Sequence, residues 1–375
     1  MALEVFKNLE KYGHEQLALF TNKDLGLRAI VAIHNTTLGP ALGGCRMWTY
    51  GNDLEAIEDC LRLSRGMTYK AAAAGLNLGG GKAVIVGDSK TAKSEGLFRA
   101  FGRFVESMNG RYITAEDVGT DVNDMEYVYM ETRYVTGVTQ AHGGSGDPSP
   151  VTAYGVLQGI KACVHETRGT DDLKGVTVAI QGLGNVGYNL LKHLLDEGAK
   201  VVATDIDRER CEKIAKDHKV VEIVKPDEIF AVNTEVFAPC AMGAIVNDDT
   251  LPKFTFKIIA GGANNQLKED RHGEALRKKG ILYAPDYVIN AGGLINVYNE
   301  LEGYDRDRAL RMTRGIYYNL LRTFAIAKKS DIPTNVAADR MAEERIETVA
   351  RSRRAFLGAN PGPLRQLEFR RSSTT

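Results

Sequence analysis

Three charged residues, Lys70, Lys82 and Asp117, have the types and spacing from which an acid–base site could be built. The two lysines flank a glycine-rich segment at 76–81, which would let the backbone fold tightly and bring both ammonium groups to one cleft. Neighbouring lysines lower each other's pKa, and burial lowers it further, so one of them could act as a base near neutral pH. The same residues could equally be two surface charges and a turn residue, and their spacing leaves both interpretations open.

A second candidate site is a G-x-G-x-x-G motif formed by Gly182-Leu183-Gly184-Asn185-Val186-Gly187. We predict a buried strand before this motif and a helix after it, which is the context in which it binds a dinucleotide. Gly182 would permit the tight turn, Gly184 would let the backbone approach the pyrophosphate, and Gly187 would let the helix pack closely on the strand. The N–H groups at the start of the helix would then hold the phosphates.

An acidic residue follows this motif at the expected distance, because Asp205 lies 18 residues after Gly187 at the end of the next predicted strand. A carboxylate in this place accepts hydrogen bonds from ribose hydroxyls and repels a 2′-phosphate, so it favours NAD over NADP. Positive charges at Arg208 and Arg210 act in the opposite direction. We therefore predict an NAD-binding site, the alternative being a glycine turn that binds nothing.

The elements that must position these residues differ between the two halves of the chain. In the first half we predict a strand at 27–35, a glycine and proline turn at 38–44, a helix capped by Asp53 that runs toward 74, a break at 76–81, and strands at 82–88 and 111–120. In the second half we predict strands at 176–184, 200–207, 234–240 and 256–265, with helices at 152–166, 185–199, 208–218, 305–329 and 336–353.

Regular alternation of strands and helices in the second half predicts a parallel, doubly wound sheet of the Rossmann type. A segment rich in glycine, serine and proline at 143–150 indicates a hinge or boundary before it. The expected fold is therefore α/β with two domains, an N-terminal α/β substrate domain at 1–140 and a Rossmann-type NAD-binding domain at 141–333. The polar tail at 361–375 is expected to fray.

Composition excludes several classes of protein. The 375 residues contain 48 Lys and Arg against 48 Asp and Glu, so the net charge of zero argues against a nucleic-acid or acidic-membrane partner. No apolar run approaches the ~18–20 residues of a membrane span, and the first residues lack the pattern of a secretory signal. Five scattered cysteines without a Cys-x-x-Cys indicate a reducing cytoplasm, and seven histidines without a His-x-x-x-His pair, His272 included, indicate no metal site.

Longer segments around the candidate residues resemble one enzyme family, the amino-acid dehydrogenases of the glutamate, leucine, phenylalanine and valine type. The resemblance runs from about residue 1 to 353 and favours the leucine-specific members. The segments that carry it are MTYK at 67–70, GGGK at 79–82, AEDVGT at 115–120, GPALGGCRMW at 39–48, QGLGNVG at 181–187, APCAMGA at 238–244, AGGANNQLKEDRHG at 260–273 and APDYVINAGG at 284–293.

The resemblance implies a fold, a reaction and a set of roles. Helices at 334–375 complete the first domain, which also carries the oligomer contacts of a homo-oligomer, an octamer in this family. The reaction is the reversible NAD-dependent deamination of L-leucine and other branched-chain L-amino acids to 2-oxo acids and ammonium. Lys70 binds the substrate carboxylate, Lys82 is the general base that activates water, and Asp117 shuttles a proton to and from the amino nitrogen. Further substrate contacts are implied for Gly43, Gly44, Met67, Ala115, Leu294 and Val297, and further cofactor contacts for Thr152, Leu183, Asn185, Val186, Tyr188, Cys240, Ala241, Asn264, Asn265 and Asn290.

Substrate choice is divided among the residues of the implied pocket. Ala115 and Trp48 match the leucine enzymes, whereas Leu294 resembles the phenylalanine enzymes at that position. A phenylalanine or valine dehydrogenase of the same fold is therefore the main alternative. A non-catalytic NAD-binding regulator is the alternative from another class, and the intact Lys70, Lys82 and Asp117 argue against it.

Overall fold

The computed structural model describes residues 5–352, which fold as two units. Unit 1 contains the described residues through Gly146, the segment Val297–Arg306 and the described residues from Ala342 onward. Unit 2 contains Asp147–Asn296 and Asp307–Met341. We expected boundaries at 140 and 333, whereas the chain leaves unit 1 after Gly146 and returns to it for good at Ala342. The tail at 361–375 lies outside the described residues.

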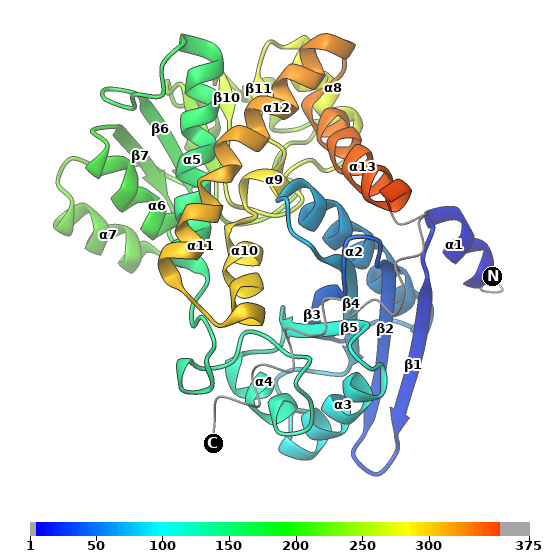
Figure 1. The fold of residues 1–375 in the computed structure, drawn as a ribbon. Helices are drawn as coiled ribbons and strands as arrows, with labels where there is room; N and C mark the ends of the chain where they lie inside the picture. The colour runs from blue at the N-terminus through cyan, green and yellow to red at the C-terminus, as the bar shows by residue number, and fades with distance from the viewer. Residues whose placement is uncertain (1–4, 353–375) are drawn as a thin grey trace. The chain divides into compact units, whose positions relative to one another are not determined.

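Unit 1 is built on a five-stranded sheet of order β1-β2-β4-β3-β5 (Figure 1). Strand β3 lies between β4 and β5 and is parallel to both, whereas β2 is antiparallel to β1 and β4. The parallel strands β4, β3 and β5 therefore direct their carboxyl ends to the same edge of the sheet. The strands are β1 (Gln16–Asn22), β2 (Leu27–Asn35), β3 (Ala41–Trp48), β4 (Gly79–Val86) and β5 (Tyr112–Glu116).

Helices cover both faces of this sheet, with α2 on one face and α3 and α4 on the other (Figure 1). The face of α2 that includes Ile57 and Leu61 packs on Ile30 and Val84 of the sheet. Asn52, and not Asp53 as we expected, caps α2, because its side chain accepts hydrogen bonds from the first free N–H groups of the helix. The helices of this part of the chain are α1 (Val5–Tyr12), α2 (Asp53–Ala73), α3 (Glu95–Ser107) and α4 (Val122–Tyr129).

Glycines that we interpreted as turns and breaks belong instead to strands β3 and β4. A Cβ atom on Gly43 would lie 1.7 Å from the carbonyl oxygen of Gly81 on β4. A Cβ atom on Gly80 would lie 2.1 Å from the backbone nitrogen of Thr68 on α2. These glycines are needed because the strands and α2 approach too closely for any side chain, and the predicted turn at 38–44 and break at 76–81 are wrong in these parts.

Unit 2 has the predicted parallel, doubly wound sheet, with six strands in the order β11-β10-β9-β6-β7-β8. Every pair in it is parallel, and the order reverses between β9 and β6, as in a Rossmann fold. Strands β9 and β10 are shorter than we predicted. The strands are β6 (Thr177–Gln181), β7 (Lys200–Thr204), β8 (Glu222–Ile223), β9 (Val236–Pro239), β10 (Ile258–Ile259) and β11 (Leu282–Tyr283).

The helices predicted for the second half are present with one correction, and three further helices, at 271–278, 286–289 and 292–298, were not predicted. The single helix expected at 305–329 is two, one that ends at Thr313 and one that begins at Gly315. The elements are α5 (Ser149–Arg168), α6 (Asn185–Asp196), α7 (Arg208–Asp217), α8 (Arg271–Lys278), α9 (Asp286–Ile289), α10 (Gly292–Tyr298), α11 (Arg306–Thr313), α12 (Gly315–Ser330) and α13 (Thr334–Ser352).

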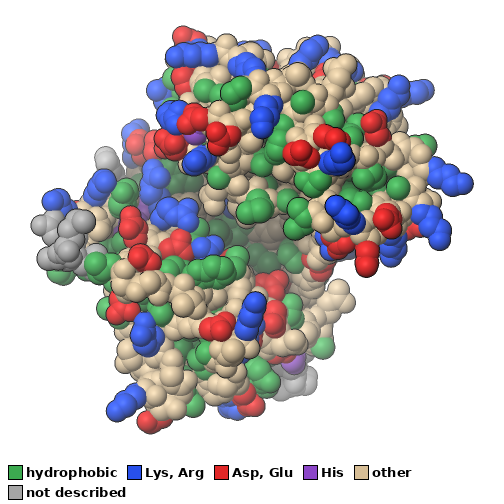
Figure 2. All heavy atoms as spheres, turned by 180° about the vertical axis from the view of Figure 1, so that it is seen from behind, with side chains coloured by type: hydrophobic (Ala, Val, Ile, Leu, Met, Phe, Trp, Pro, Cys, Tyr) green, Lys and Arg blue, Asp and Glu red, His purple; other side chains and the backbone are tan. Residues whose placement is uncertain are grey.

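The distribution of charge on the surface agrees with the net charge of zero. On the face seen in Figure 2, acidic and basic side chains are interspersed and form no broad patch of one sign. Within the described residues, no helix combines the length and the apolarity that a membrane crossing requires.

Arg345 of α13 joins the end of the described chain to the carboxyl end of α2. Its guanidinium donates to the carbonyl oxygens of Leu76 at 2.7 Å and Gly75 at 3.1 Å, and to Oδ1 of Asn77 at 3.1 Å. These groups follow the last turn of α2, the turn that carries Lys70. The negative end of the α2 dipole favours a cation in this place.

We predict that Arg345→Ala lowers the free energy of unfolding by about 2 kcal/mol, because several carbonyl groups lose a charged donor. The measurement is urea denaturation of the purified protein. Arg351→Ala on the same helix is the matched control, since Arg351 pairs only with the exposed Glu347 at 2.9 Å in the described residues. Equal stability of the two variants would contradict the prediction.

Candidate functional site

Lys82 and Asp117 are in direct contact in unit 1, where the Lys82 Nζ donates to Oδ2 of Asp117. Lys82 lies in β4, and Asp117 directly follows β5. The strand between them, β3, places Gly44 beside Ala115 of β5. A Cβ atom on Gly44 would lie 2.8 Å from the Asp117 Cβ and 2.6 Å from the carbonyl oxygen of Glu116. The missing side chain at Gly44 therefore makes the room in which the Asp117 carboxylate reaches the lysine.

The turn after β5 is tied to β3, which fixes Asp117. The Thr120 hydroxyl donates to the carbonyl oxygen of Cys45 at 2.8 Å and accepts from the N–H of Asp117 at 2.9 Å. The N–H of Met47 donates to the carbonyl oxygen of Val118 at 3.0 Å. Gly119 completes the turn at φ +84°, a conformation that favours glycine. Asp117 is consequently held by the backbone of the sheet rather than by a free loop.

Burial gives Lys82 the property that a base needs. Its side chain is 7% exposed, and burial, followed by the positive charge of Arg46, lowers the pKa of Lys82 to about 7. The adjoining Asp117 carboxylate favours the ammonium form and opposes this shift. We expected Lys70 to be the charge that lowers this pKa, whereas the main positive charge acting on Lys82 is Arg46.

Arg46 is a site residue to which we assigned no role from the sequence. It lies on β3, its Nη1 donates to Oδ2 of Asp59 at 2.7 Å, and its Nε lies 3.8 Å from Oδ2 of Asp117. The motif GPALGGCRMW contains it, but a single arginine just after the predicted turn at 38–44 gave no signal of its function. Side chains on a strand alternate between the two faces of the sheet, so Arg46, two residues after Gly44 on β3, lies on the same face as Gly44. This alternation is the sequence signal that could have identified Arg46.

The other predicted substrate residues of unit 1 lie on the elements around this pair. Lys70 is in the last turn of α2 and Met67 one turn earlier, and both are half-buried. Ala115 is 7% exposed on β5, two residues before Asp117. Gly43 is buried on β3 and is explained by its contact with β4, as described above.

In unit 2, the three glycines of the motif differ in what surrounds them. A Cβ atom on Gly187 would lie 1.9 Å from the carbonyl oxygen of Gly182, and Gly182 itself has φ +94°. Both are therefore required by the fold of this chain. Gly184 has ordinary backbone angles, and a Cβ atom there would meet nothing within 4 Å. Since the protein itself leaves that space open, Gly184 is suited to the approach of a ligand phosphate.

The start of α6 and the strand ends beside it carry the residues for which we predicted dinucleotide contacts in unit 2. Gly184 is the N-cap of α6 and offers no side-chain cap, so the first N–H groups of α6 remain for an anion. Cys240 and Ala241 follow β9, the neighbour of β6 where the strand order reverses. Asn290 is buried, and its Nδ2 donates to Oδ1 of Asn264 at 2.7 Å. The Oδ1 atom of Asn290 is buried and has no hydrogen-bond partner within the described residues.

Asp205 directly follows β7 and is held close to the motif. Its Oδ2 accepts from the N–H of Leu183 at 2.6 Å, and Oδ1 accepts from the N–H of Asp207 at 2.9 Å. Burial alone would raise the pKa of Asp205, but these hydrogen bonds and the charge of Arg210 outweigh burial and hold it below its usual range. The Arg210 guanidinium pairs with the carboxylate of Asp205 at 3.4 Å and with that of Asp207 at 3.3 Å. Its charge is thus shared by two anions, and both Arg208 and Arg210 are exposed.

The remaining predicted residues lie at several positions. Thr152 is in the first turn of α5, where its hydroxyl donates to the carbonyl oxygen of Pro148 at 3.0 Å, and Tyr188 is half-buried on α6. Asn265 is exposed at φ 50°. Leu294 and Val297 both lie on α10, where Leu294 is 6% exposed and Val297 is half-buried. Leu294 belongs to unit 2 and Val297 to unit 1.

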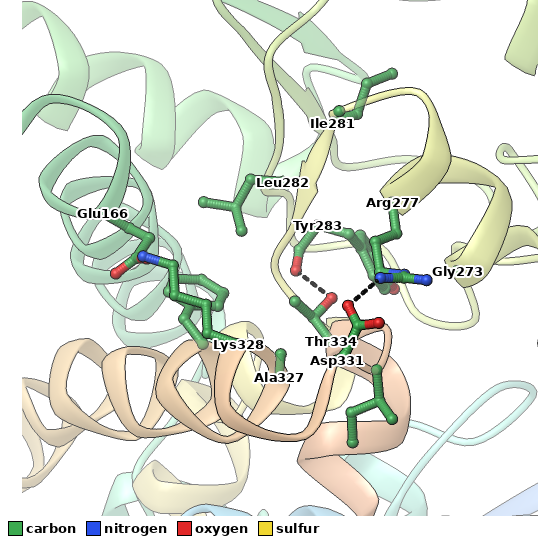
Figure 3. A pocket seen from close by; sticks show the side chains of 13 residues that line it. Glu166, Gly273, Arg277, Ile281, Leu282, Tyr283, Ala327, Lys328, Asp331 and Thr334 are labelled. Carbon is green, nitrogen blue, oxygen red and sulfur yellow. Dashed lines mark hydrogen bonds and ion pairs between the residues drawn. The ribbon is translucent and has the colours of Figure 1, made fainter.

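A pocket of about 310 Å³ opens elsewhere in unit 2, between α5, α8, β11 and α12 (Figure 3). None of the predicted site residues lines it. Its charged side chains are paired with one another, since Lys328 contacts Glu166 and Arg277 lies 2.6 Å from Asp331. With these charges neutralised, nothing in the lining indicates a reaction.

Within residues 5–352, one cluster has metal-ligand residue types, namely Asp248, Glu269 and His272 in unit 2. The Arg271 guanidinium donates to Asp248 at 2.6 Å and to Glu269 at 2.9 Å. Nδ1 of the buried His272 accepts from the N–H of Glu269 at 3.0 Å. A cation already lies between the carboxylates, so we interpret this cluster as structural.

Comparison with known proteins gives a consistent family. The model of the "Glu/Leu/Phe/Val dehydrogenase, dimerisation domain" matches residues 14–134. The model of "Glutamate/Leucine/Phenylalanine/Valine dehydrogenase" matches residues 143–209 and 204–308. These matches cover most of both units.

Individual relatives agree with the family models. The leucine dehydrogenase of Thermoactinomyces intermedius is 58% identical over 95% of this chain and 97% of its own length. The phenylalanine dehydrogenase of Bacillus thermotolerans is 49% identical over 95% of each chain. Among solved structures, the L-tryptophan dehydrogenase of Nostoc punctiforme has a TM-score of 0.84 at 46% identity, covering 92% of this chain and 100% of the other. A hetero-hexameric glutamate dehydrogenase of Thermus thermophilus, 23% identical with a TM-score of 0.73 over 92% of this chain and 91% of the other, shares the fold.

The contrast among the motif glycines predicts different costs of substitution. Gly187→Ala should lower the free energy of unfolding by about 1–3 kcal/mol, since the new methyl overlaps the Gly182 carbonyl oxygen. Gly184→Ala should change it by less than about 0.5 kcal/mol, because its methyl enters open space. Chemical denaturation without added ligand measures both, and similar losses in the two variants would show that Gly184 is also a packing glycine.

Proposed function

Since the chain belongs to the glutamate/leucine/phenylalanine/valine dehydrogenase family and is an amino-acid dehydrogenase, we propose that it catalyses the NAD-dependent oxidative deamination of L-leucine and other branched-chain L-amino acids. The reaction consumes the amino acid, NAD⁺ and water and gives the 2-oxo acid, ammonium, NADH and a proton. The observation that carries this proposal is the buried Lys82 in contact with Asp117, a pair able to exchange protons near neutral pH.

In the proposed reaction, the residues of unit 1 bind the substrate and move its protons. Lys70 would pair with the α-carboxylate, because an ammonium group at the end of α2 is a compact positive charge. Neutral Lys82 would take a proton from the water that attacks the iminium carbon of the substrate. Asp117, in contact with Lys82, would exchange a proton with the amino nitrogen. Together these steps convert the iminium group into a carbonyl and release ammonium.

The residues of unit 2 fit a nicotinamide dinucleotide. The open space at Gly184, the uncapped start of α6 and the unpartnered Oδ1 of Asn290 are features that a ligand with phosphates and an amide would complete. When bound, NAD⁺ supplies the acceptor for the hydride that leaves the substrate Cα. The motif glycines, Cys240, Ala241 and Asn264 would hold it.

NAD is favoured over NADP in this proposal because of Asp205. Its carboxylate lies beside the motif, accepts from the Leu183 N–H, and stays charged because its pKa is held low. A 2′-phosphate placed there would meet a negative charge. Arg210, which could have offset that charge, is engaged by Asp205 and Asp207.

Branched aliphatic side chains are the proposed substrates for two reasons. The relatives named leucine dehydrogenase are 56–58% identical to this chain, whereas those named phenylalanine dehydrogenase are 48–49% identical. The methyl of Ala115 also takes up space beside Asp117 that a glycine would leave for a ring. We further propose that the protein is a homo-oligomer, an octamer by its family resemblance, and light scattering would measure its mass.

The test of this function is the rate of NADH formation with leucine, valine, isoleucine and phenylalanine, repeated with NADP⁺. Leucine with NAD⁺ should give the highest kcat/KM. Ala115→Gly should raise the ratio of kcat/KM for phenylalanine to kcat/KM for leucine. The change should correspond to about 1–3 kcal/mol in transition-state free energy, the usual effect of one carbon in an apolar pocket. A wild-type preference for phenylalanine would favour the alternative assignment, and an unchanged ratio in Ala115→Gly would remove Ala115 from the substrate pocket.

Lys82 should set both the rate and its pH dependence. Lys82→Ala should lower kcat by roughly 10²–10⁴-fold, the usual contribution of a general base. In the wild type the base must be neutral, so kcat/KM for deamination should fall as pH decreases through about 7, the pKa to which burial lowers Lys82. NAD binding by the variant, measured by fluorescence titration, is the control. A variant with near-normal kcat would exclude Lys82 as the base.

A further inference from the structure

We propose that Arg46 is a positioning residue that serves as the permanent cationic partner of the Asp117 carboxylate and so leaves Lys82 free to give up its proton. This inference rests on the proposed function, in which Lys82 is the base. It adds a role for a residue that neither touches the water nor exchanges protons. The reasons are the place of Arg46 in the sheet, the way in which it is anchored, and the charges around Lys82.

Arg46 lies on the strand between those of the two reacting groups. Strand β3 pairs with β4, which carries Lys82, and with β5, which Asp117 follows. Alternation along parallel strands puts Arg46 on the same face as Gly44, and Gly44 has no side chain to separate the charged groups. The Arg46 Nε consequently lies 3.8 Å from Oδ2 of Asp117, the same oxygen that contacts Lys82.

Asp59 of α2 holds the guanidinium in this position. Its Oδ2 accepts from Nη1 of Arg46 at 2.7 Å and from the Tyr50 hydroxyl at 2.8 Å, and its Oδ1 accepts from Arg62 at 2.9 Å. These bonds fix one edge of the planar guanidinium. The Nε atom, which belongs to the other part of the group, is buried and makes no hydrogen bond within the described residues. The anchored arginine therefore presents charge toward Asp117 without competing for its hydrogen bonds.

The charged and titratable groups around Lys82 explain why a second cation affects the pKa of Lys82. Asp117 faces it from the turn after β5, Arg46 and the Cys45 thiol from β3, and Asp59 and the Cys60 thiol from α2. An isolated carboxylate beside a lysine stabilises the ammonium form. Arg46 is always protonated, and it balances Asp117 whether or not Lys82 carries a proton. A balanced Asp117 would lower the pKa of Lys82, and this pKa is indeed lowered, with burial as the largest cause and the charge of Arg46 as the next.

The experiment measures the titration of Lys82 directly. Trace acetic anhydride is added at a series of pH values, and mass spectrometry quantifies acetylation of Lys82 relative to the exposed Lys90 in the full-length protein. Arg46→Gln should move the half-point for Lys82 to higher pH by about one unit, since an uncompensated carboxylate then faces it. Arg46→Lys, which restores the charge, should return most of that shift.

A second variant keeps the test decisive if Arg46→Gln does not fold. Asp59→Asn removes a negative charge near Lys82, while the amide oxygen of the asparagine can still accept the hydrogen bond from Nη1 that anchors Arg46, so the half-point should move to lower pH. Shifts of opposite sign are not produced by general loosening of the site. Arg62→Gln is the matched control, because Arg62 touches Asp59 from the exposed side and is 57% exposed, and the half-point should stay unchanged.

The pH profile of kcat/KM for leucine supplies the second readout, and its acidic limb should move with the labelling half-point. An unchanged half-point in Arg46→Gln, or an equal shift in Arg62→Gln, would overturn the role of Arg46 while leaving the proposed function intact. If the half-points shift as expected and even the wild type does not oxidise leucine, the electrostatic role stands and the proposed function fails.

Discussion

The candidate site of unit 1 depends on the absence of side chains where three parallel strands meet. Gly43 lets β3 lie against β4, Gly80 lets β4 lie against α2, and Gly44 leaves the space that Asp117 enters. Any Cβ atom at these positions would overlap backbone or, at Gly44, also the Asp117 side chain. Close packing is therefore the condition for the chemistry, because it brings a lysine in the middle of one strand to a carboxylate beyond the end of another.

Close packing also creates an electrostatic problem, since a lysine buried to this degree favours its neutral form. A carboxylate in contact with it would favour the charged form, and the two effects oppose each other. The arrangement of Arg46 and Asp59 brings a fixed cation to the carboxylate from the strand between. Packing thus determines which charges can approach, and those charges determine which protonation state Lys82 holds.

The sequence predicted the Rossmann sheet and the motif glycines because their strands, turn and helix follow one another closely along the chain. Unit 1 was harder to predict, because its glycines were interpreted through local propensity. Gly43 and Gly79 read as turn formers, yet they lie in strands whose partners are distant in sequence, and tertiary packing decides their conformation. The role of Arg46 was missed for the same reason, since its interactions are with Asp59 on α2 and Asp117 after β5.

Both units place their candidate residues at the carboxyl ends of parallel strands. Asp117 follows β5 in one unit, and the glycine motif follows β6 in the other. At such ends the chain leaves the sheet, and a turn can adopt the shape that a ligand requires while the strand keeps it in place. The turns achieve this in different ways, since the Thr120 hydroxyl ties one to β3 whereas Gly182 and Gly187 pack the other against itself. Gly184 differs from both, because a Cβ atom there would meet no atom of the described residues, and the space beside it at the start of α6 stays open.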